Sequence, residues 1–265
     1  MPITLLGIPY DGSSSFTRGS AGGPAALRAA LRFDGSNSWN EDEDDVVPLL
    51  VDAGDLLLDG VADPRPLIEG RVDALLTAGA RPLCIGGDHS ITWPIVRAVR
   101  RHVPRLTILH LDAHPDLYDA LDGDRGSHGS PFARIMEEKL ANYLVQCGIR
   151  TINQHQREQA RRFGVEIHAM RSGAEAMISA ARRLDGPVYL SLDLDVLDPA
   201  FAPGLSHPEP GGLSTREVIS ILQAIPRGRL VAADLVELNP VNDLRDLTAR
   251  VGAKLVKEIV ARMVG

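Results

Sequence analysis

Acidic residues and histidines recur at short spacings in four segments of the chain. Residues 86–90 read GGDHS and residues 112–116 read DAHPD. Residues 193–195 read DLD, and residues 237–240 read ELNP. Gathering this many carboxylates in one place without a cation costs much free energy, through mutual repulsion and desolvation. The residue types therefore predict a site for divalent metal ions.

Six residues of the first three segments are the candidate metal ligands: His89, Asp112, His114, Asp116, Asp193 and Asp195. Residues two apart in a strand point to the same side, so Asp112 can converge with His114. The same spacing lets Asp193 converge with Asp195. No cysteine belongs to the set, which argues against a structural zinc site or an iron–sulfur cluster. Carboxylates with fewer imidazoles suit Mn²⁺ best, with Fe²⁺, Co²⁺, Ni²⁺ or Zn²⁺ as alternatives. A metal pair that holds a bridging water gives hydroxide near neutral pH, which predicts a hydrolase.

Short apolar segments alternate with helical patterns along the whole chain, and this alternation positions the four segments. Strands are predicted over 3–8, 48–53, 82–86, 106–112, 143–149, 165–169, 187–195 and 229–236. Helices are predicted over 23–32, 65–79, 91–102, 131–141, 155–162, 173–184, 214–225 and 248–263. The alternation predicts an α/β domain with a parallel sheet covered by helices on both faces. Ligands of such sheets bind outside the carboxyl ends of the strands, where the four segments lie.

Length and charge limit the class of protein. The 265 residues suit a single domain over 1–265, and 44% of them are hydrophobic, which supports a large buried core. The net charge of −7 and the lack of a basic patch argue against nucleic acid and anionic membrane partners. No apolar stretch approaches the roughly 20 residues that a membrane helix needs. The first residues lack the pattern of a signal peptide, so we expect a cytoplasmic protein. Cys84 and Cys147 lie in apolar segments and are predicted to be buried free thiols.

Other polar residues have simpler interpretations. His110 at the end of a predicted strand is predicted to be structural, and Asp198 before a proline is predicted to cap a turn. The acidic segment 34–46 is predicted to be a surface loop, and 198–212 a long ordered loop. His128, in the loop after the fourth strand, is either a surface residue or a proton shuttle. The remaining histidines are predicted to be structural or on the surface, although the last of them could line the pocket: His102, His155, His168 and His207.

The motifs resemble the three signatures of the ureohydrolases, the arginase/agmatinase family. They are GGDHS at 86–90, DAHPD at 112–116 and SLDLDVLDP at 191–199. The resemblance continues through PAFAPG at 199–204 and EPGGLS at 209–214, and it is greatest to plant-type arginases and agmatinase-like enzymes. It implies a three-layer α/β/α sandwich with an eight-stranded parallel sheet, and a homo-oligomer, either a trimer or a hexamer.

The resemblance also implies roles for individual residues. Two Mn²⁺ ions per subunit would be held by the six candidate ligands, with Asp112 and Asp193 bridging them. Glu237 matches the family glutamate that faces the substrate guanidinium, and His128 matches the proton-shuttle histidine. The leaving amine would receive its proton through Asp195 and then His128. The implied products are urea and an amine.

The implied substrate is a small cationic guanidino compound. Animal-type arginases hold the α-carboxylate of arginine with Asn and Ser residues in a longer loop, whereas segment 117–127 is short and lacks that pattern. Plant-type arginases also lack that loop. Because segment 117–127 lacks that carboxylate-binding pattern, we rank agmatine first. Arginine comes second, because the plant-type arginases share this feature, and guanidinobutyrate or another guanidino acid comes third. Two alternatives remain, namely a different hydrolase such as a formimidoyl hydrolase, and a catalytically silent metal-binding oligomer.

Overall fold

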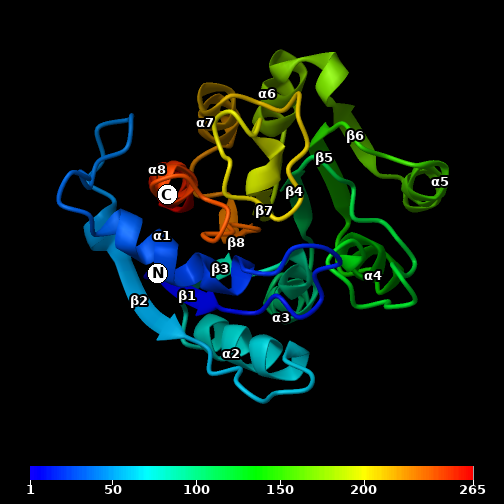
Figure 1. The fold of residues 1–265 in the computed structure, drawn as a ribbon, viewed down its shortest axis with the longest axis horizontal. Helices are drawn as coiled ribbons and strands as arrows, with labels where there is room; N and C mark the ends of the chain where they lie inside the picture. Colours follow the sequence, from blue (N-terminus) through cyan, green and yellow to red (C-terminus); the bar gives the residue numbers. More distant parts are fainter. Residues whose placement is uncertain (265) are drawn as a thin grey trace.

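Strands and helices alternate from end to end in the computed structural model, which describes residues 1–264 (Figure 1). The strands are β1 (Ile3–Ile8), β2 (Leu50–Asp55), β3 (Arg81–Gly86), β4 (Thr107–Leu111), β5 (Tyr143–Ile149), β6 (Glu166–Ala169), β7 (Val188–Asp193) and β8 (Leu230–Val236). The α-helices are α1 (Gly23–Leu31), α2 (Arg65–Thr77), α3 (Thr92–His102), α4 (Pro131–Glu137), α5 (Gln154–Phe163), α6 (Ala174–Arg182), α7 (Thr215–Ala224) and α8 (Leu247–Met263). The expected order of strands and helices is confirmed, with small shifts at their ends.

The eight strands form one parallel sheet in the order β2-β1-β3-β8-β7-β4-β5-β6. The four strands that precede the acidic and histidine segments, β3, β8, β7 and β4, are therefore neighbours at the centre of the sheet. Because parallel strands all end at the same edge, the four segments meet there although they are far apart in the sequence.

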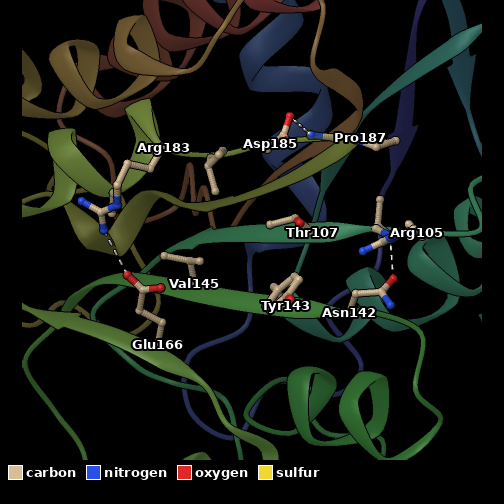
Figure 2. A pocket seen from close by; sticks show the side chains of 13 residues that line it. Arg105, Thr107, Asn142, Tyr143, Val145, Glu166, Arg183, Asp185 and Pro187 are labelled. Atoms are coloured by element: carbon tan, nitrogen blue, oxygen red, sulfur yellow. Dashed lines mark hydrogen bonds and ion pairs between the residues drawn. The ribbon is translucent and has the colours of Figure 1, made fainter.

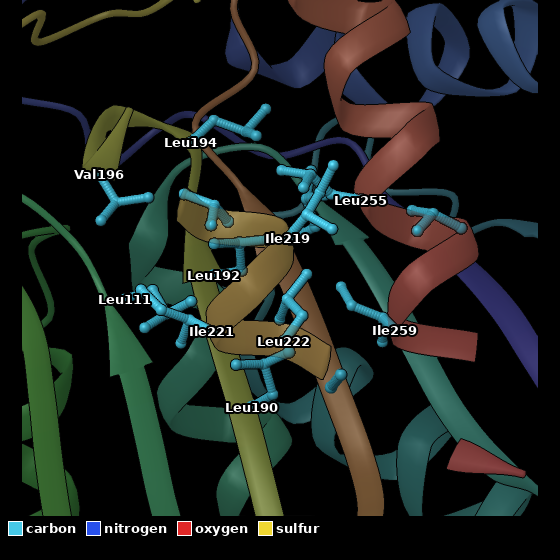
Figure 3. Packing of buried hydrophobic residues seen from close by; sticks show 14 of the residues in the cluster. Leu111, Leu190, Leu192, Leu194, Val196, Ile219, Ile221, Leu222, Leu255 and Ile259 are labelled. Atoms are coloured by element: carbon cyan, nitrogen blue, oxygen red, sulfur yellow. The ribbon is translucent and has the colours of Figure 1, made fainter. Parts of the chain in front are cut away.

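Helices cover both faces of the sheet, so the predicted three-layer arrangement is confirmed (Figure 1). Helices α1, α6, α7 and α8 bury one hydrophobic cluster, and α2 to α5 bury the other. Figure 3 shows the first cluster, in which Ile219 and Leu222 of α7 lie between Leu192 of β7 and Ile259 of α8. The strand pattern follows from this double burial, because a strand covered on both faces needs few polar residues.

Local sequence signals set the ends of two helices, α5 and α7. Asn153 and Gln156 form a capping box at the start of α5, and Gly164 ends the helix in the left-handed conformation. Ser214 and Glu217 form the same kind of box at the start of α7. These caps satisfy backbone N–H groups that would otherwise lack partners, so both helices begin at defined residues.

Strand alternation, which we expected to align the paired ligands, is not what aligns them. β4 ends at Leu111, so Asp112 and His114 lie beyond the strand. Leu194–Val196 form a 3-10 turn, so Asp195 is not in a strand either. The residues still converge, but through turns that follow the strands.

Two smaller predictions, on the cysteines and on Asp198, are confirmed. Cys84 and Cys147 are buried free thiols. Asp198 accepts hydrogen bonds from the backbone N–H groups of Ala200 and Gly211, as expected of a residue that caps a turn. Within residues 1–264 there is no helix with the length and apolar character needed to cross a bilayer.

Candidate metal centre

The side chains of His89, Asp112, Asp116 and Asp193 converge at the centre of the sheet edge. The Nδ1 atom of His89 lies 3.2 Å from Oδ2 of Asp112 and 3.1 Å from Oδ2 of Asp116. It lies 3.0 Å from Oδ2 of Asp193. This nitrogen is buried and makes no hydrogen bond of acceptable geometry with any described residue. A buried nitrogen aimed at three carboxylate oxygens, without a hydrogen bond to any, has the arrangement of a metal ligand.

His114 and Asp195 adjoin the first group on the side of the pocket. Nδ1 of His114 lies 2.8 Å from Oδ2 of Asp195 and 3.5 Å from Oδ1 of Asp112. Ligand atoms of these three residues are close enough together to hold one ion. Asp112 therefore touches both groups, which is the position of a bridging ligand.

Backbone N–H groups fix the orientation of the carboxylates. Asp112 Oδ1 accepts from the N–H of His114, two residues ahead, and Asp193 Oδ1 accepts from the N–H of Asp195. Such bonds are typical of Asp in a turn, and they bend the chain immediately after each strand. Asp116 has a positive φ of 50°, a conformation that costs free energy for a residue with a side chain.

The acid–base properties of the cluster indicate that a cation is needed. Burial, followed by repulsion from Asp195 and Asp112, raises the pKa of Asp193 well above its usual value. Burial, followed by the charge of Asp112, raises the pKa of Asp195 to about 6. Burial opposes protonation of His114, but the charge of Asp195 and hydrogen bonds outweigh it and raise its pKa to about 12. Protons thus stabilise the buried charges here, and divalent metal would take over that role, so the residues fit the implied metal pair.

His110 lies beside this cluster but both of its ring nitrogens are engaged. Its Nδ1 lies 3.0 Å from the side-chain nitrogen of Gln146, which can only donate. Nε2 therefore carries the proton and donates to Oδ2 of Asp112 at 2.7 Å. His110 orients Asp112, in agreement with the structural role expected for it.

Glu237 and His128 form the wall of the adjoining cavity, which has a volume of about 220 Å³. Glu237 is buried with φ of 66°, and its Oε1 accepts from the backbone N–H of His89 at 2.9 Å. Its other oxygen, Oε2, has no hydrogen-bond partner among the described residues. Burial opposes protonation of His128, but its interaction with Glu237 outweighs burial and raises the histidine pKa. The structure thus brings the six candidate ligands together and places Glu237 and His128 beside them.

Several lining residues were missed or left undecided by the sequence analysis. They are Ser15, Tyr118, Leu121, Gly129, Thr151, Gln156 and His207. The His207 ring is stacked on that of His128, with their centroids 4.6 Å apart. Ser15 belongs to the loop after β1, and its Oγ lies 2.8 Å from Nε2 of His128. The run of small polar residues at 11–15 was the only sequence signal for that loop.

A larger cavity, of about 620 Å³, lies at the opposite edge of the sheet (Figure 2). It is lined by residues at the amino ends of β4, β5 and β7, including Thr107, Tyr143 and Pro187. Arg183 pairs with Glu166 across it at 3.4 Å. The described residues that line this cavity include no histidine and no cluster of carboxylates, so the candidate site is the smaller cavity.

Comparison with known proteins gives a consistent result. Residues 1–261 match the model of the arginase family. "Arginase 1, mitochondrial" of Arabidopsis thaliana is 45% identical over 276 residues, with coverage of 98% of this chain and 80% of that protein. An agmatinase of Bacillus anthracis is 34% identical over 264 residues, with coverage of 97% and 90%. The structure of the arginase from Medicago truncatula gives a TM-score of 0.90 at 41% identity, with coverage of 98% and 86%.

Proposed function

Because the chain belongs to the arginase family of metal-dependent ureohydrolases, we propose that it hydrolyses a linear guanidino compound, preferably agmatine, to urea and an amine. The observation that carries this proposal is Oε2 of Glu237, a buried carboxylate oxygen in the cavity beside the candidate metal ligands, which has no hydrogen-bond partner in the described part of the chain. A planar guanidinium offers parallel N–H donors that match a carboxylate, so Glu237 suits such a substrate.

The six candidate ligands would hold two divalent ions: His89, Asp112, His114, Asp116, Asp193 and Asp195. The abundance of carboxylates and the absence of thiolates support Mn²⁺ as the native metal. When bound, the ions would supply a Lewis acid that lowers the pKa of water and makes it a nucleophile near neutral pH.

Glu237 would orient the substrate with its guanidinium carbon toward the metal ligands. Its Oε1 is held by the backbone N–H of His89, which leaves Oε2 to accept from the substrate. The backbone of Glu237 is left-handed, and its N–H donates a hydrogen bond to the Gly87 carbonyl. These two features fix the backbone from which the side chain extends. A carboxylate held in this way binds the cation without reorganising, which favours reaction over simple binding.

His128 would move the proton that the leaving amine requires. Nδ1 lies 3.7 Å from Glu237 Oε1, so it faces the place where the substrate binds. Nε2 lies 2.8 Å from the Ser15 hydroxyl at the exposed side of the cavity. One ring nitrogen thus faces the substrate position and the other faces the solvent side. A histidine placed in this way can pass protons between substrate and solvent.

The side chains that line the cavity support agmatine over arginine. The lining includes Asp116, Asp193, Asp195 and Glu237, and none of the described lining residues is Lys or Arg. The α-carboxylate of arginine would therefore find no guanidinium or ammonium partner in this wall, whereas agmatine needs none. Arg125 does not line the cavity; it is exposed and paired with Glu137 at 2.9 Å.

Arginine is the second candidate, and the similarity to plant arginases favours it. The identity of 45% to the arginase of Arabidopsis thaliana exceeds the 34% to the agmatinase of Bacillus anthracis. Neutral donors such as the Ser15 hydroxyl could receive a carboxylate by hydrogen bonding alone.

Urea release by Mn²⁺-loaded protein tests the proposal with agmatine, arginine and guanidinobutyrate as separate substrates. We expect the largest kcat/KM with agmatine and loss of activity in an Asp193→Asn variant. A larger kcat/KM with arginine would reverse the preference but keep the reaction. No urea from any of the three, with metal bound, would overturn the proposed reaction and favour a silent metal-binding protein or a formimidoyl hydrolase.

A further inference from the structure

A fully buried carboxylate, Asp234 of β8, accepts hydrogen bonds from three hydroxyl groups. Oδ1 accepts from Ser191 at 2.7 Å, and Oδ2 accepts from Thr92 at 2.8 Å. The Tyr189 hydroxyl also donates to Oδ2. All four side chains are 0% exposed. A charge this deep in the core is costly, so three directed donors must stabilise it.

Ser191 connects this carboxylate to the candidate metal site. Its Oγ lies 2.9 Å from Nε2 of His89. The single proton of the serine hydroxyl is donated to Asp234, so Oγ can only accept from His89. Nε2 therefore carries a proton, and the lone pair of Nδ1 is directed at the carboxylates of the metal site.

The strand pattern explains how these residues come together. Tyr189, Ser191 and Asp193 alternate along β7, so they share one face of the sheet. Asp234 is the register partner of Ser191 on the neighbouring strand. Three successive positions of one strand face thus provide a donor to Asp234, the link to His89 and a candidate metal ligand.

We infer that Ser191 and Asp234 are positioning residues that hold His89 in the tautomer and orientation needed to bind metal. This inference rests on the proposed function, because it takes His89 as a metal ligand. The physical reason is general, since metal-binding histidines usually donate their other N–H to a polar group, and loss of that group weakens metal binding. His110 and Gln146 orient Asp112 in a similar way from β4 and β5.

The Mn²⁺ dissociation constant tests the inference, measured by equilibrium dialysis on the metal-stripped full-length protein. Ser191→Ala removes the link and leaves Asp234 with two donors, and Asp234→Asn removes the charge that orients the serine. We expect each variant to raise the dissociation constant about 10- to 100-fold. The matched control is Ser20→Ala, the same change at a buried serine whose Oγ has no partner among the described residues.

A thermal melt of each metal-free variant separates positioning from general damage to the core. We expect metal-free Ser191→Ala to melt close to the Ser20→Ala control while binding Mn²⁺ far more weakly. Equal Mn²⁺ affinity in the two variants would overturn the inference. The same holds if Ser191→Ala loses affinity only in proportion to a lower melting temperature. Urea release by the wild-type protein is a separate readout, so the proposed reaction can fail while the metal-binding inference stands.

Discussion

His128 and Glu237 lie side by side in the wall of the cavity, with Nδ1 of the histidine 3.7 Å from Oε1 of the glutamate. This pairing raises the histidine pKa against the effect of burial, so the imidazole can hold a proton near neutral pH. We expect His128→Asn to lower kcat about 100- to 10,000-fold, because general acid–base catalysis contributes about that much. KM should change little, since the substrate contacts remain. Steady-state kinetics with the preferred substrate checks this, and an unchanged kcat would exclude His128 as the proton carrier.

Glu237→Gln keeps the shape of the side chain but removes its charge. A hydrogen bond to a charged group contributes about 1.5–3 kcal/mol, so kcat/KM should fall about 10- to 150-fold. The same change should lower the pKa of His128, because Glu237 is the main group that raises it. Kinetics and an NMR titration of the histidine in metal-free protein measure the two effects. A lower kcat/KM with an unchanged pKa of His128 would show that Glu237 does not set the protonation of the histidine.

Removal of metal should lower the thermal stability of the protein. The carboxylates of Asp112, Asp193 and Asp195 repel one another without a cation, and a ligand bound only by the folded state stabilises it. At 100 times its dissociation constant, Mn²⁺ should add about 2.7 kcal/mol, or roughly 5–10 °C in melting temperature. A chelator should reverse the shift, and Asp193→Asn should abolish most of it. The prediction fails if the chelator leaves the melting temperature of the wild type unchanged.

Gly87 permits a close approach between two loops of the site. A Cβ atom at this position would lie 1.7 Å from the backbone oxygen of Tyr10, in the loop that leads to Ser15. Backbone must shift to relieve such a contact, so Gly87→Ala should destabilise the fold by roughly 1–3 kcal/mol and lower activity. Gly70→Ala is the control, because it lies in α2 with open space around it. That change should stabilise the fold by about 0.5–1 kcal/mol, and similar melting temperatures for both variants would contradict the argument.

Glu41 of the acidic segment should make stability depend on pH. Two hydrogen bonds of 2.6 Å from the Arg216 guanidinium are the main reason its pKa falls from 4.5 to about 2. A lowered carboxyl pKa stabilises the fold fully above pH 4.5, and this contribution is lost as pH falls toward 2. Glu41→Gln should therefore be less stable than wild type at pH 6, by under about 1 kcal/mol for an exposed pair. Thermal melts should show this gap close near pH 2, and a gap independent of pH would contradict the pairing.

The sequence by itself determined the order of strands and helices and the six candidate metal ligands. Apolar runs such as residues 106–109 are too short for a typical helix and lie between helical patterns, so their length and setting indicate strands buried on both faces. The ligand candidates could be named because carboxylates and histidines at strand ends have few structural explanations. Glu237 and His128 needed more than spacing, and only the family resemblance distinguished them from ordinary loop residues.

Only the tertiary structure decided how these residues are oriented. Alternation along strands did not predict the turns that carry Asp112, His114 and Asp195, because side-chain hydrogen bonds to the backbone begin where the strand ends. The stacking of His207 on His128 depends on contacts across long sequence separations. The link from Asp234 through Ser191 to His89 joins two strands and a loop, so no local pattern could reveal it. Residue type and spacing limit the possible chemistry, but the direction of each donor and acceptor is fixed by packing.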